Sequence, residues 1–261
     1  MEVTDQEKDL GVLISDTLLW SDHVKKGISK ANQMIGWITR NFILREKSVM
    51  IRIYKALIRH LIEYCVPVWS PQPEHGSWSL ILELEGVQRR FTRLIDGMGQ
   101  LPYSERLGAL NLTTLAERRI RGDLIETFKA CKEFSSLGHI FNDGRSRMNL
   151  KSNFSSNFNV SSKVNKLKRN FLTERVIKYW NKLPLEVKDS ESVNSFKSRL
   201  QYFKEDCISK GLTSESYFWN VSYLVIDKIE SPSYLENRIK HLEYIKDKPL
   251  VAKKQFINLR N

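Results

Sequence analysis

The chain has 261 residues, 41% of them hydrophobic and 10% aromatic, which is enough for one large or two small domains with a sizeable core. It carries 42 Lys and Arg residues against 30 Asp and Glu, a formal net charge of +12 that favours a polyanionic partner or surface. No apolar run approaches the roughly 20 residues that span a bilayer, and the acidic first residues do not resemble a signal peptide. Three widely separated cysteines, Cys65, Cys131 and Cys207, suit free thiols in a reducing compartment. We therefore expect an intracellular protein of the nucleus or cytoplasm, with no membrane contact.

The basic residues are unevenly distributed along the chain. Residues 22–134 hold 18 basic and 12 acidic side chains, residues 135–204 hold 14 and five, and the two ends contribute little positive charge. Charge and residue patterns together divide the chain into segments 1–20, 21–134, 135–204 and 205–261. The first contains a short strand at 12–14. Because a lone strand is not stable, its partners lie elsewhere in the chain or are missing from it.

Four amphipathic helices are predicted in the second segment from apolar residues spaced three or four apart. Ser21 or Asp22 is expected to cap the first helix. The second runs from near Glu46 to before Pro67, and the third centres on 82–95. A capping box at 114–117 starts the fourth. Their apolar faces are Val24, Ile28, Ala31, Ile35, Ile38 and Phe42; Met50, Ile53, Leu57, Leu61 and Tyr64; Leu84, Val87, Phe91, Leu94, Ile95 and Met98; and Ile120, Leu124, Phe128 and Cys131. The predicted fold is mainly α, a helical bundle with antiparallel neighbours after a short β segment.

The third segment, 135–204, is strongly basic. Alternating stretches at 148–154 and 163–171 could pair as a hairpin. Thr173 is expected to cap a short helix that buries Val176, Trp180 and Leu183, and a last clear helix carries Val193, Phe196, Leu200, Phe203 and Cys207 on one stripe. Beyond Gly211 the pattern weakens, although Ser233 with Glu236 could cap one more helix with Leu235, Ile239, Leu242 and Ile245 as its face. We thus expect a small basic hairpin-plus-helix unit and a tail of unknown origin.

Basic side chains recur on the helix faces opposite the apolar ones. A helix turns about 100° per residue, so Arg89, Arg90 and Arg93 fall on the arc opposite Leu84 and Phe91. The simplest interpretation of one such face is solvated surface, but its recurrence on consecutive helices favours a nucleic-acid-binding role. The candidate phosphate-contacting residues are Lys25, Lys26, Lys30, Arg89, Arg90, Arg93, Arg118, Arg119 and, at the edge of its face, Arg121, with a second cluster of Lys166, Lys168 and Arg169.

The sequence contains no constellation that supports catalysis or metal binding. There is no adjacent Asp-Asp pair for two magnesium ions, no glycine-rich phosphate loop and no Cys-x-x-Cys pair. His60 and Glu63 share a helix face, but no second histidine stands at the right spacing for zinc. We therefore predict no catalytic residue, no metal ligand and no cofactor in this chain.

Several short motifs, taken together, resemble the C-terminal part of reverse transcriptases from non-LTR, LINE-type retrotransposons of the jockey-like kind. Each is weak alone, but their order and spacing over residues 8 to about 203 make the resemblance specific. They are KDLGV at 8–12 with Trp20 and His23; YKALIR at 54–59 with IEY at 62–64 and VWSP at 68–71; LEGVQRR at 84–90; YSERL at 103–107; LTTL at 112–115 with ERR at 117–119 and RGDLI at 121–125; RNF at 169–171 with RV at 175–176 and WNKLP at 180–184; and FKSRL at 196–200.

The resemblance implies that residues 1–20 are the end of a polymerase palm and that the following helices form a thumb along a template–primer duplex. The Tyr/Phe-x-Asp-Asp motif of the family is absent, so the chain is expected to be inactive alone, and magnesium would belong to the missing palm. The endonuclease domain and cysteine-rich knuckle that some such elements carry are absent as well, and residues from about 205 match nothing in the family.

Three hypotheses follow from these observations. The first is a reverse transcriptase fragment that binds an RNA–DNA or DNA duplex without sequence preference. The second is a host-adapted interaction module whose exposed apolar face binds the missing palm or another protein. The third is a translated relic that folds poorly. RNA or DNA preference stays open, because no aromatic stacking platform stands out.

Overall fold

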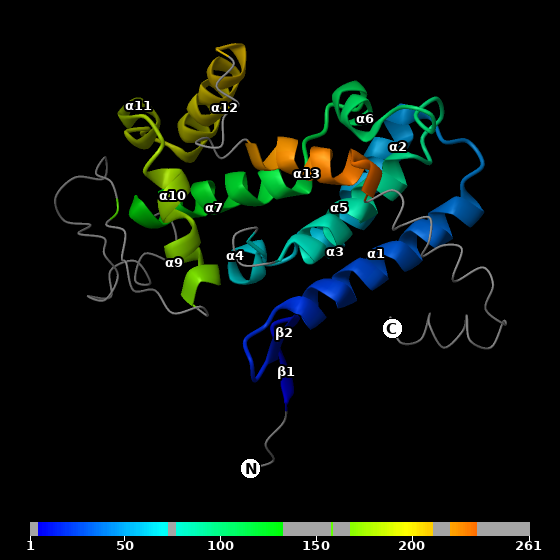
Figure 1. The fold of residues 1–261 in the computed structure, drawn as a ribbon, viewed down its shortest axis with the longest axis horizontal. Coiled ribbons are helices and arrows are strands. Elements are labelled where there is room, and N and C mark those ends of the chain that lie inside the picture. Colours follow the sequence, from blue (N-terminus) through cyan, green and yellow to red (C-terminus); the bar gives the residue numbers. More distant parts are fainter. Residues whose placement is uncertain (1–4, 73–76, 133–157, 159–167, 211–219, 234–261) are drawn as a thin grey trace. The chain divides into compact units, whose positions relative to one another are not determined.

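The computed structural model describes residues 5–72, 77–132, 158, 168–210 and 220–233. Over these residues the chain is mainly α, with a short antiparallel hairpin near the N-terminus, which confirms the predicted class (Figure 1). It divides into two compact units. Unit 1 comprises Met1–Cys65, Pro73–Leu115 and Tyr223–Asn261, and unit 2 comprises Val66–Gln72 and Ala116–Ser222.

The predicted first strand finds its partner within the chain. Strand β2 (Val12–Ser15) pairs antiparallel with β1 (Gln6–Asp9), with Gln6 opposite Ser15 and Asp9 opposite Val12. Leu10 (φ 43°) and Gly11 (φ 89°) make the connection, and two positive φ values are what a tight two-residue hairpin loop requires. The hairpin thus resolves the question of where the partner strand lies.

Helix α1 (Ser21–Asn41) buries the face that its spacing predicts. Val24, Ala31, Ile35 and Ile38 are buried, whereas Ile28 and Phe42 are half-buried. The expected cap is wrong: Trp20 is the N-cap residue and makes no side-chain cap bond. Asp22 lies inside the first turn, where its carboxylate accepts a hydrogen bond of 2.7 Å from the Gln6 side chain.

The second predicted helix contains a π-helical turn that changes its buried face. It consists of α2 (Lys47–Ile53), the π-helix η1 (Tyr54–Ile58) and α3 (Arg59–Glu63). A π-helix has more than four residues per turn, so residues four apart stay on one face through it. The buried residues are Met50, Tyr54, Ile58 and Ile62. Of the predicted face only Met50 is fully buried; Ile53, Leu57 and Leu61 are half-buried and Tyr64 is exposed.

Three further helices, α5, α6 and α13, contribute to unit 1. Helix α5 (Trp78–Thr92) buries Leu84, Val87 and Phe91 as predicted, and Ile95 is buried in the turns that follow it, whereas Leu94 and Met98 are half-buried. Helix α6 (Tyr103–Ala109) follows Pro102, and helix α13 (Asn220–Glu230) begins in unit 2 and ends in unit 1. The sequence did not predict α6 or α13 as helices.

Unit 2 has its own apolar core. Its elements are α4 (Val66–Trp69), α7 (Leu115–Cys131, from Ala116 on), the 3-10 turn η3 (Lys168–Asn170), α9 (Leu172–Arg175), α10 (Ile177–Trp180), α11 (Leu185–Lys188) and α12 (Val193–Ser209). The Phe128 ring of α7 stacks on Phe196 of α12 with centroids 4.4 Å apart, and Trp180 stacks on Phe158 at 5.5 Å. Most of the predicted core residues are buried, whereas Val193 and Phe203 are half-buried; the buried ones are Ile120, Leu124, Phe128, Cys131, Val176, Trp180, Leu183, Phe196, Leu200 and Cys207.

Details at the ends of these elements differ from the predictions. Thr173 lies inside α9, whose N-cap residue is Phe171, so the expected Thr173 cap is wrong. Ser192 caps α12 by accepting a 3.1 Å hydrogen bond from the Ser195 amide. The strand predicted at 163–171 is wrong at its end, because 168–170 form η3. The remainder of that hairpin and the helix expected after Ser233 lie outside the described residues.

Candidate nucleic-acid interface

Helix α1 presents three exposed lysines, Lys25, Lys26 and Lys30, on the side away from its apolar face. None of them makes a hydrogen bond or ion pair with another residue in the described part of the chain. The single acidic residue of α1, Asp22, is engaged with Gln6. This face therefore presents positive charge that no protein carboxylate neutralises within that part.

The pKa of His23, in the first turn of α1, is lowered in part by nearby lysines. The Nδ1 atom of His23 accepts a hydrogen bond of 3.1 Å from the Leu13 amide, which ties β2 to α1. Burial lowers the pKa of His23, and the charges of Lys26 and Lys30 lower it further. These effects and the hydrogen bond from Leu13 all favour the neutral imidazole, since a neutral ring can accept a hydrogen bond at Nδ1.

Helix α5 carries the second basic face of unit 1 and packs along α1. Arg90 and Arg93 are exposed and Arg89 is half-buried. Arg90 donates from Nη1 to the Oδ1 atom of Asn32 on α1, so it lies at the junction of the two helices. Six of the predicted site residues therefore lie on these two packed helices or at the end of α5, which are Lys25, Lys26, Lys30, Arg89, Arg90 and Arg93.

A fourth arginine is hydrogen-bonded to the end of α5. Arg106 of α6 is only 1% exposed, and its Nη1 donates to the Arg89 carbonyl at 2.9 Å and to Thr92 Oγ1 at 3.1 Å. Its Nε has no hydrogen-bond partner among the described residues. Burial, followed by the charges of Arg93 and Arg89, lowers the Arg106 pKa to about 10. We define Arg89, Arg93 and Arg106 as the arginine cluster. Sequence analysis missed Arg106, although it stands in the YSERL motif.

The predicted basic residues of unit 2 differ from one another in exposure. Arg118 and Arg121 are half-buried, and burial together with the charge of Arg118 lowers the pKa of Arg121. Arg119 is only 4% exposed, so the prediction that it points away from the core is wrong. The reason is that α7 is buried over more of its circumference than one apolar arc. Lys168 is exposed, whereas Lys166 and the side chain of Arg169 lie outside what the structure describes.

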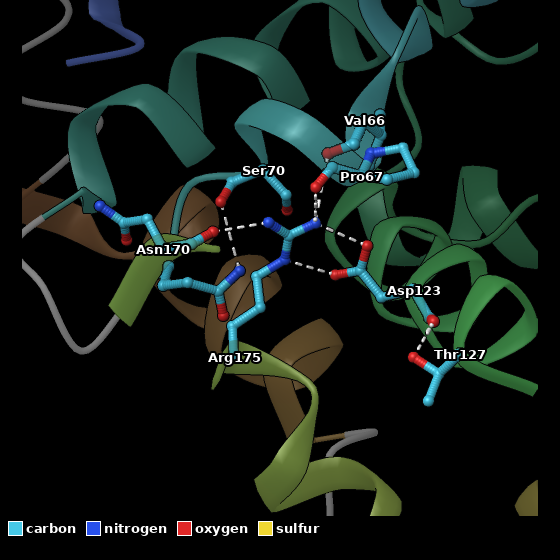
Figure 2. Close-up of polar contacts among 8 residues, drawn as sticks. Val66, Pro67, Ser70, Asp123, Thr127, Asn170 and Arg175 are labelled. Atoms are coloured by element: carbon cyan, nitrogen blue, oxygen red, sulfur yellow. Dashed lines mark hydrogen bonds and ion pairs between the residues drawn. The ribbon is translucent and has the colours of Figure 1, made fainter. Parts of the chain in front are cut away.

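A buried ion pair fixes three segments of unit 2 around one guanidinium (Figure 2). Arg175 donates from Nε and Nη2 to the two carboxylate oxygens of Asp123 at 2.8 and 2.7 Å. It also donates to the carbonyls of Pro67 at 2.9 Å, Val66 at 3.3 Å and Asn170 at 2.6 Å. Burial raises the pKa of Asp123, and the charge and hydrogen bonds of Arg175 oppose that rise. Asp123 belongs to the motif RGDLI and Arg175 to the motif RV. The sequence suggested no structural role for either motif.

Unit 1 contains a buried polar network that sequence analysis also missed. Gln88 accepts from the Tyr54 hydroxyl at 2.5 Å and donates to the Tyr103 hydroxyl at 2.8 Å. Tyr103 in turn donates to Glu85 at 2.5 Å, and the Leu115 amide donates to the same carboxylate at 2.9 Å. Burial and the Glu85 charge raise the pKa of Tyr103 well above its usual value. The network rigidifies the α5–α6 scaffold that carries the arginines.

The described residues contain neither a metal-binding group nor a membrane-spanning helix. No group of three or more His, Cys, Asp and Glu side chains there is placed to hold a metal ion. No helix in the same residues is long and apolar enough to cross a membrane. Comparison of the chain with protein-family models, with curated proteins and with solved structures found no match.

Proposed function

We propose that unit 1 binds the sugar–phosphate backbone of a nucleic-acid duplex through the faces of α1 and α5. One observation carries the proposal: Lys25, Lys26, Lys30 and Arg93 are exposed on two helices that pack together, and none is hydrogen-bonded or ion-paired with another described residue. Exposed cations that no protein carboxylate pairs attract polyanions, and their binding releases counterions.

Several cations of unit 2 are, by contrast, paired with carboxylates. Lys204 contacts Glu117, and Lys129 and Lys210 lie 2.7 Å from Glu126 and Asp206. Those charges are compensated within the protein, which leaves less positive potential for a ligand. The α1–α5 face is therefore the stronger candidate for the principal contact. Exposed Lys168 and half-buried Arg118 and Arg121 would add secondary contacts, whereas buried Arg119 is not assigned to phosphate.

The resemblance to LINE-type reverse transcriptases gives this binding a context. In that context the helices of residues 21–134, α1 and α5 among them, correspond to the thumb, and the duplex is an RNA–DNA template–primer. Phosphate contacts position a duplex without reading its sequence, so the proposed binding is sequence-independent. The proposal concerns binding alone and assigns no catalytic residue to this chain.

The test is binding of the full chain to a labelled RNA–DNA hybrid over a salt series, by fluorescence anisotropy. Each phosphate neutralised contributes a slope of roughly 0.7–0.9 to the plot of log affinity against log salt. We expect a wild-type slope of about −4 or steeper. The triple variant K25Q/K26Q/K30Q should have a slope shallower by about 2 to 3.

A matched control removes the same charge from the same unit. Lys47, Arg52 and Lys55 are exposed on α2 and η1, and K47Q/R52Q/K55Q lowers the net charge equally. A flat wild-type slope, or equal losses in the two triple variants, would refute the assignment of the α1–α5 face.

A second candidate function, protein interaction, is favoured by apolar side chains around the hairpin. Leu10, Leu19 and Tyr64 are 85%, 56% and 54% exposed, and the Tyr64 hydroxyl donates to the Leu10 carbonyl at 2.7 Å. The partner would be the missing palm domain or another protein. Size-exclusion chromatography with light scattering tests the case in which the other protein is a second copy of this chain: a defined dimer lost in L10S/L19S would support it, and a monomer at all concentrations would exclude it.

A further inference from the structure

An exposed tryptophan lies on the basic face of α1. Trp37 is 47% exposed, although it stands next to the fully buried Ile38. Helical geometry places Trp37 on one arc of about 80° together with three exposed cations, Lys26, Lys30 and Arg40. Helical spacing alone does not show that a tryptophan stays exposed, and for this reason the sequence indicated no aromatic stacking platform. The structure provides one within a row of positive charges.

The positive charges on either side of the ring are not compensated by the protein. Arg40, like Lys26 and Lys30, makes no hydrogen bond or ion pair with another residue in the described ranges. At 1.5 Å per residue, Trp37 lies about 10 Å beyond Lys30 along the helix axis, a distance of about three stacked base steps. Phosphates and a base of one strand can therefore reach the lysines and the ring together.

The end of α1 holds the Trp37 ring in place. Its ring packs edge-on against Phe42, with centroids 6.1 Å apart and planes at 67°. Arg45 donates from Nε to the Phe42 carbonyl at 3.3 Å and from Nη2 to the Thr39 carbonyl at 3.2 Å. The Asn41 side chain donates to the Trp37 carbonyl at 2.8 Å. A ring held in this way loses little conformational entropy when a ligand packs against it.

An aromatic ring among uncompensated cations has the chemistry that binds unpaired nucleotides, because bases stack on the ring while phosphates pair with the cations. A base inside a duplex is already covered on both faces by its neighbours. Trp37 can therefore stack only on an unpaired base or on the last pair of a duplex. Another protein could also cover an exposed tryptophan, but the cations Lys30 and Arg40 on the same arc favour nucleic acid.

We propose that Trp37 stacks on a base of a single-stranded extension, while Lys26 and Lys30 contact phosphates of the adjoining duplex. Arg40 contacts a phosphate of the extension. This inference rests on the proposed nucleic-acid binding and specifies its substrate class, a duplex that continues as a single strand. The base is held by its flat face, so the contact is independent of sequence.

The test measures binding of the full chain to three kinds of RNA–DNA hybrid that share one duplex. The first is blunt, and the second carries a short single-stranded RNA extension, placed at the 5′ end or the 3′ end in two separate ligands. The end that the wild type binds more tightly is used for the variants. The third kind carries an extension of abasic nucleotides at that end, which keeps the phosphates and removes the bases.

Four variants separate stacking from charge and from general apolar contact. W37L removes the aromatic ring, W37F keeps one, and R40Q removes a cation. Tyr202 of α12 is 73% exposed, so Y202L makes a matched loss of an exposed aromatic ring on another helix. Trp37 is half open to solvent, and unfolding curves of the variants check that each keeps the fold.

We expect W37L to bind the extended hybrid about 5- to 50-fold more weakly than wild type and the blunt hybrid within about twofold of it. W37F should keep most of the affinity, and Y202L should keep all of it. The salt slope should stay unchanged in W37L and become shallower by about one phosphate contact in R40Q. The wild type should bind the abasic extension about as weakly as W37L binds the normal one.

Equal losses of W37L on blunt and extended hybrids, no loss at all, or tight binding of the abasic extension would overturn the stacking role. So would a W37F variant as weak as W37L. A dimer that is lost in W37L, with hybrid binding unchanged, would assign Trp37 to a protein contact instead. In each of these cases the proposed function stands if K25Q/K26Q/K30Q still weakens binding of the blunt hybrid. A folded wild type that binds none of the hybrids would overturn both proposals.

Discussion

Arg175 and Asp123, 52 residues apart in sequence, form a two-pronged ion pair with side chains only 1% exposed. The remaining donors of the guanidinium go to the carbonyls of Val66, Pro67 and Asn170. One side chain therefore connects α4, α7 and the turn before α9 within unit 2. Asp123 belongs to RGDLI and Arg175 to RV, two of the motifs on which the resemblance to reverse transcriptases rests. The ion pair gives both motifs a structural role in this chain.

We predict that R175M destabilises the protein by about 3–5 kcal/mol, because it leaves a buried carboxylate without its cation. D123L should have a similar effect on the free energy of unfolding. The double variant R175M/D123L should lose less than the sum, since neither charge is then buried alone. Urea unfolding of the three variants measures the coupling. Strictly additive losses would show that the pair does not act as a unit.

Tyr103 allows a test of the buried network in unit 1. Its hydroxyl donates to Glu85 and accepts from Gln88, so Y103F leaves two buried polar groups with one partner fewer. We expect a loss of about 1–3 kcal/mol in the free energy of unfolding. Tyr202 is 73% exposed, and Y202F is the matched control, with an expected change within about 0.5 kcal/mol. Similar values for the two variants would contradict the proposed role of the network.

Helical spacing predicted the fold class and the buried faces of α1, α7 and α12, because burial there follows the helical period. It failed at η1, where a π-turn keeps Met50, Tyr54, Ile58 and Ile62 on one face. The residue types in this stretch give no indication that one of its turns is wider than an α-helical turn. Cap residues were also predicted poorly, since Ser192 caps a helix and Thr173 does not.

The candidate site was predicted in part, for a related reason. Exposure of Lys25, Lys26 and Lys30 follows from one amphipathic helix, so sequence alone sufficed. Arg119 and Arg106 are buried by neighbouring elements, and a helical wheel contains no information about these neighbours. The only sign of such burial in the sequence is a polar residue next to the apolar arc of its helix. That position does not show which element covers the residue.

His23 is expected to make stability depend on pH. Its pKa in the folded protein lies below the ordinary value of 6.5, so the unfolded chain binds the proton more readily. The contribution of neutral His23 to the free energy of unfolding is therefore fully present above pH 6.5. It is lost as the pH falls from 6.5 through the pKa of His23 in the folded protein. In H23N this component of the pH dependence should disappear. Unfolding curves between pH 5 and 8 measure it, and identical profiles for the two proteins would exclude His23 as the cause.

The three thiols should differ in reactivity. Burial raises the pKa of Cys131 to about 12, and Cys131 and Cys207 are 3% and 2% exposed. Cys65 is half-buried, and burial raises its pKa as well. We expect slow labelling at Cys65 first in the native protein and labelling of all three in urea, because only the accessible thiolate reacts. Peptide mass spectrometry identifies the site, and early labelling of Cys131 would contradict the described core.

Arg93 and Arg90 should affect duplex binding in different ways. Arg93 is exposed and makes no hydrogen bond or ion pair with the described residues, so R93A should lower the salt slope by about one phosphate contact. Arg90 is oriented by Asn32, and N32A should reproduce part of the loss seen in R90A without changing the charge. Because phosphate contacts carry no sequence information, these losses should be equal on hybrids of unrelated sequence. A loss confined to one sequence would mean that the arginines contact bases. The basic residues of α1 and α5 would then recognise sequence instead of binding only the phosphate backbone.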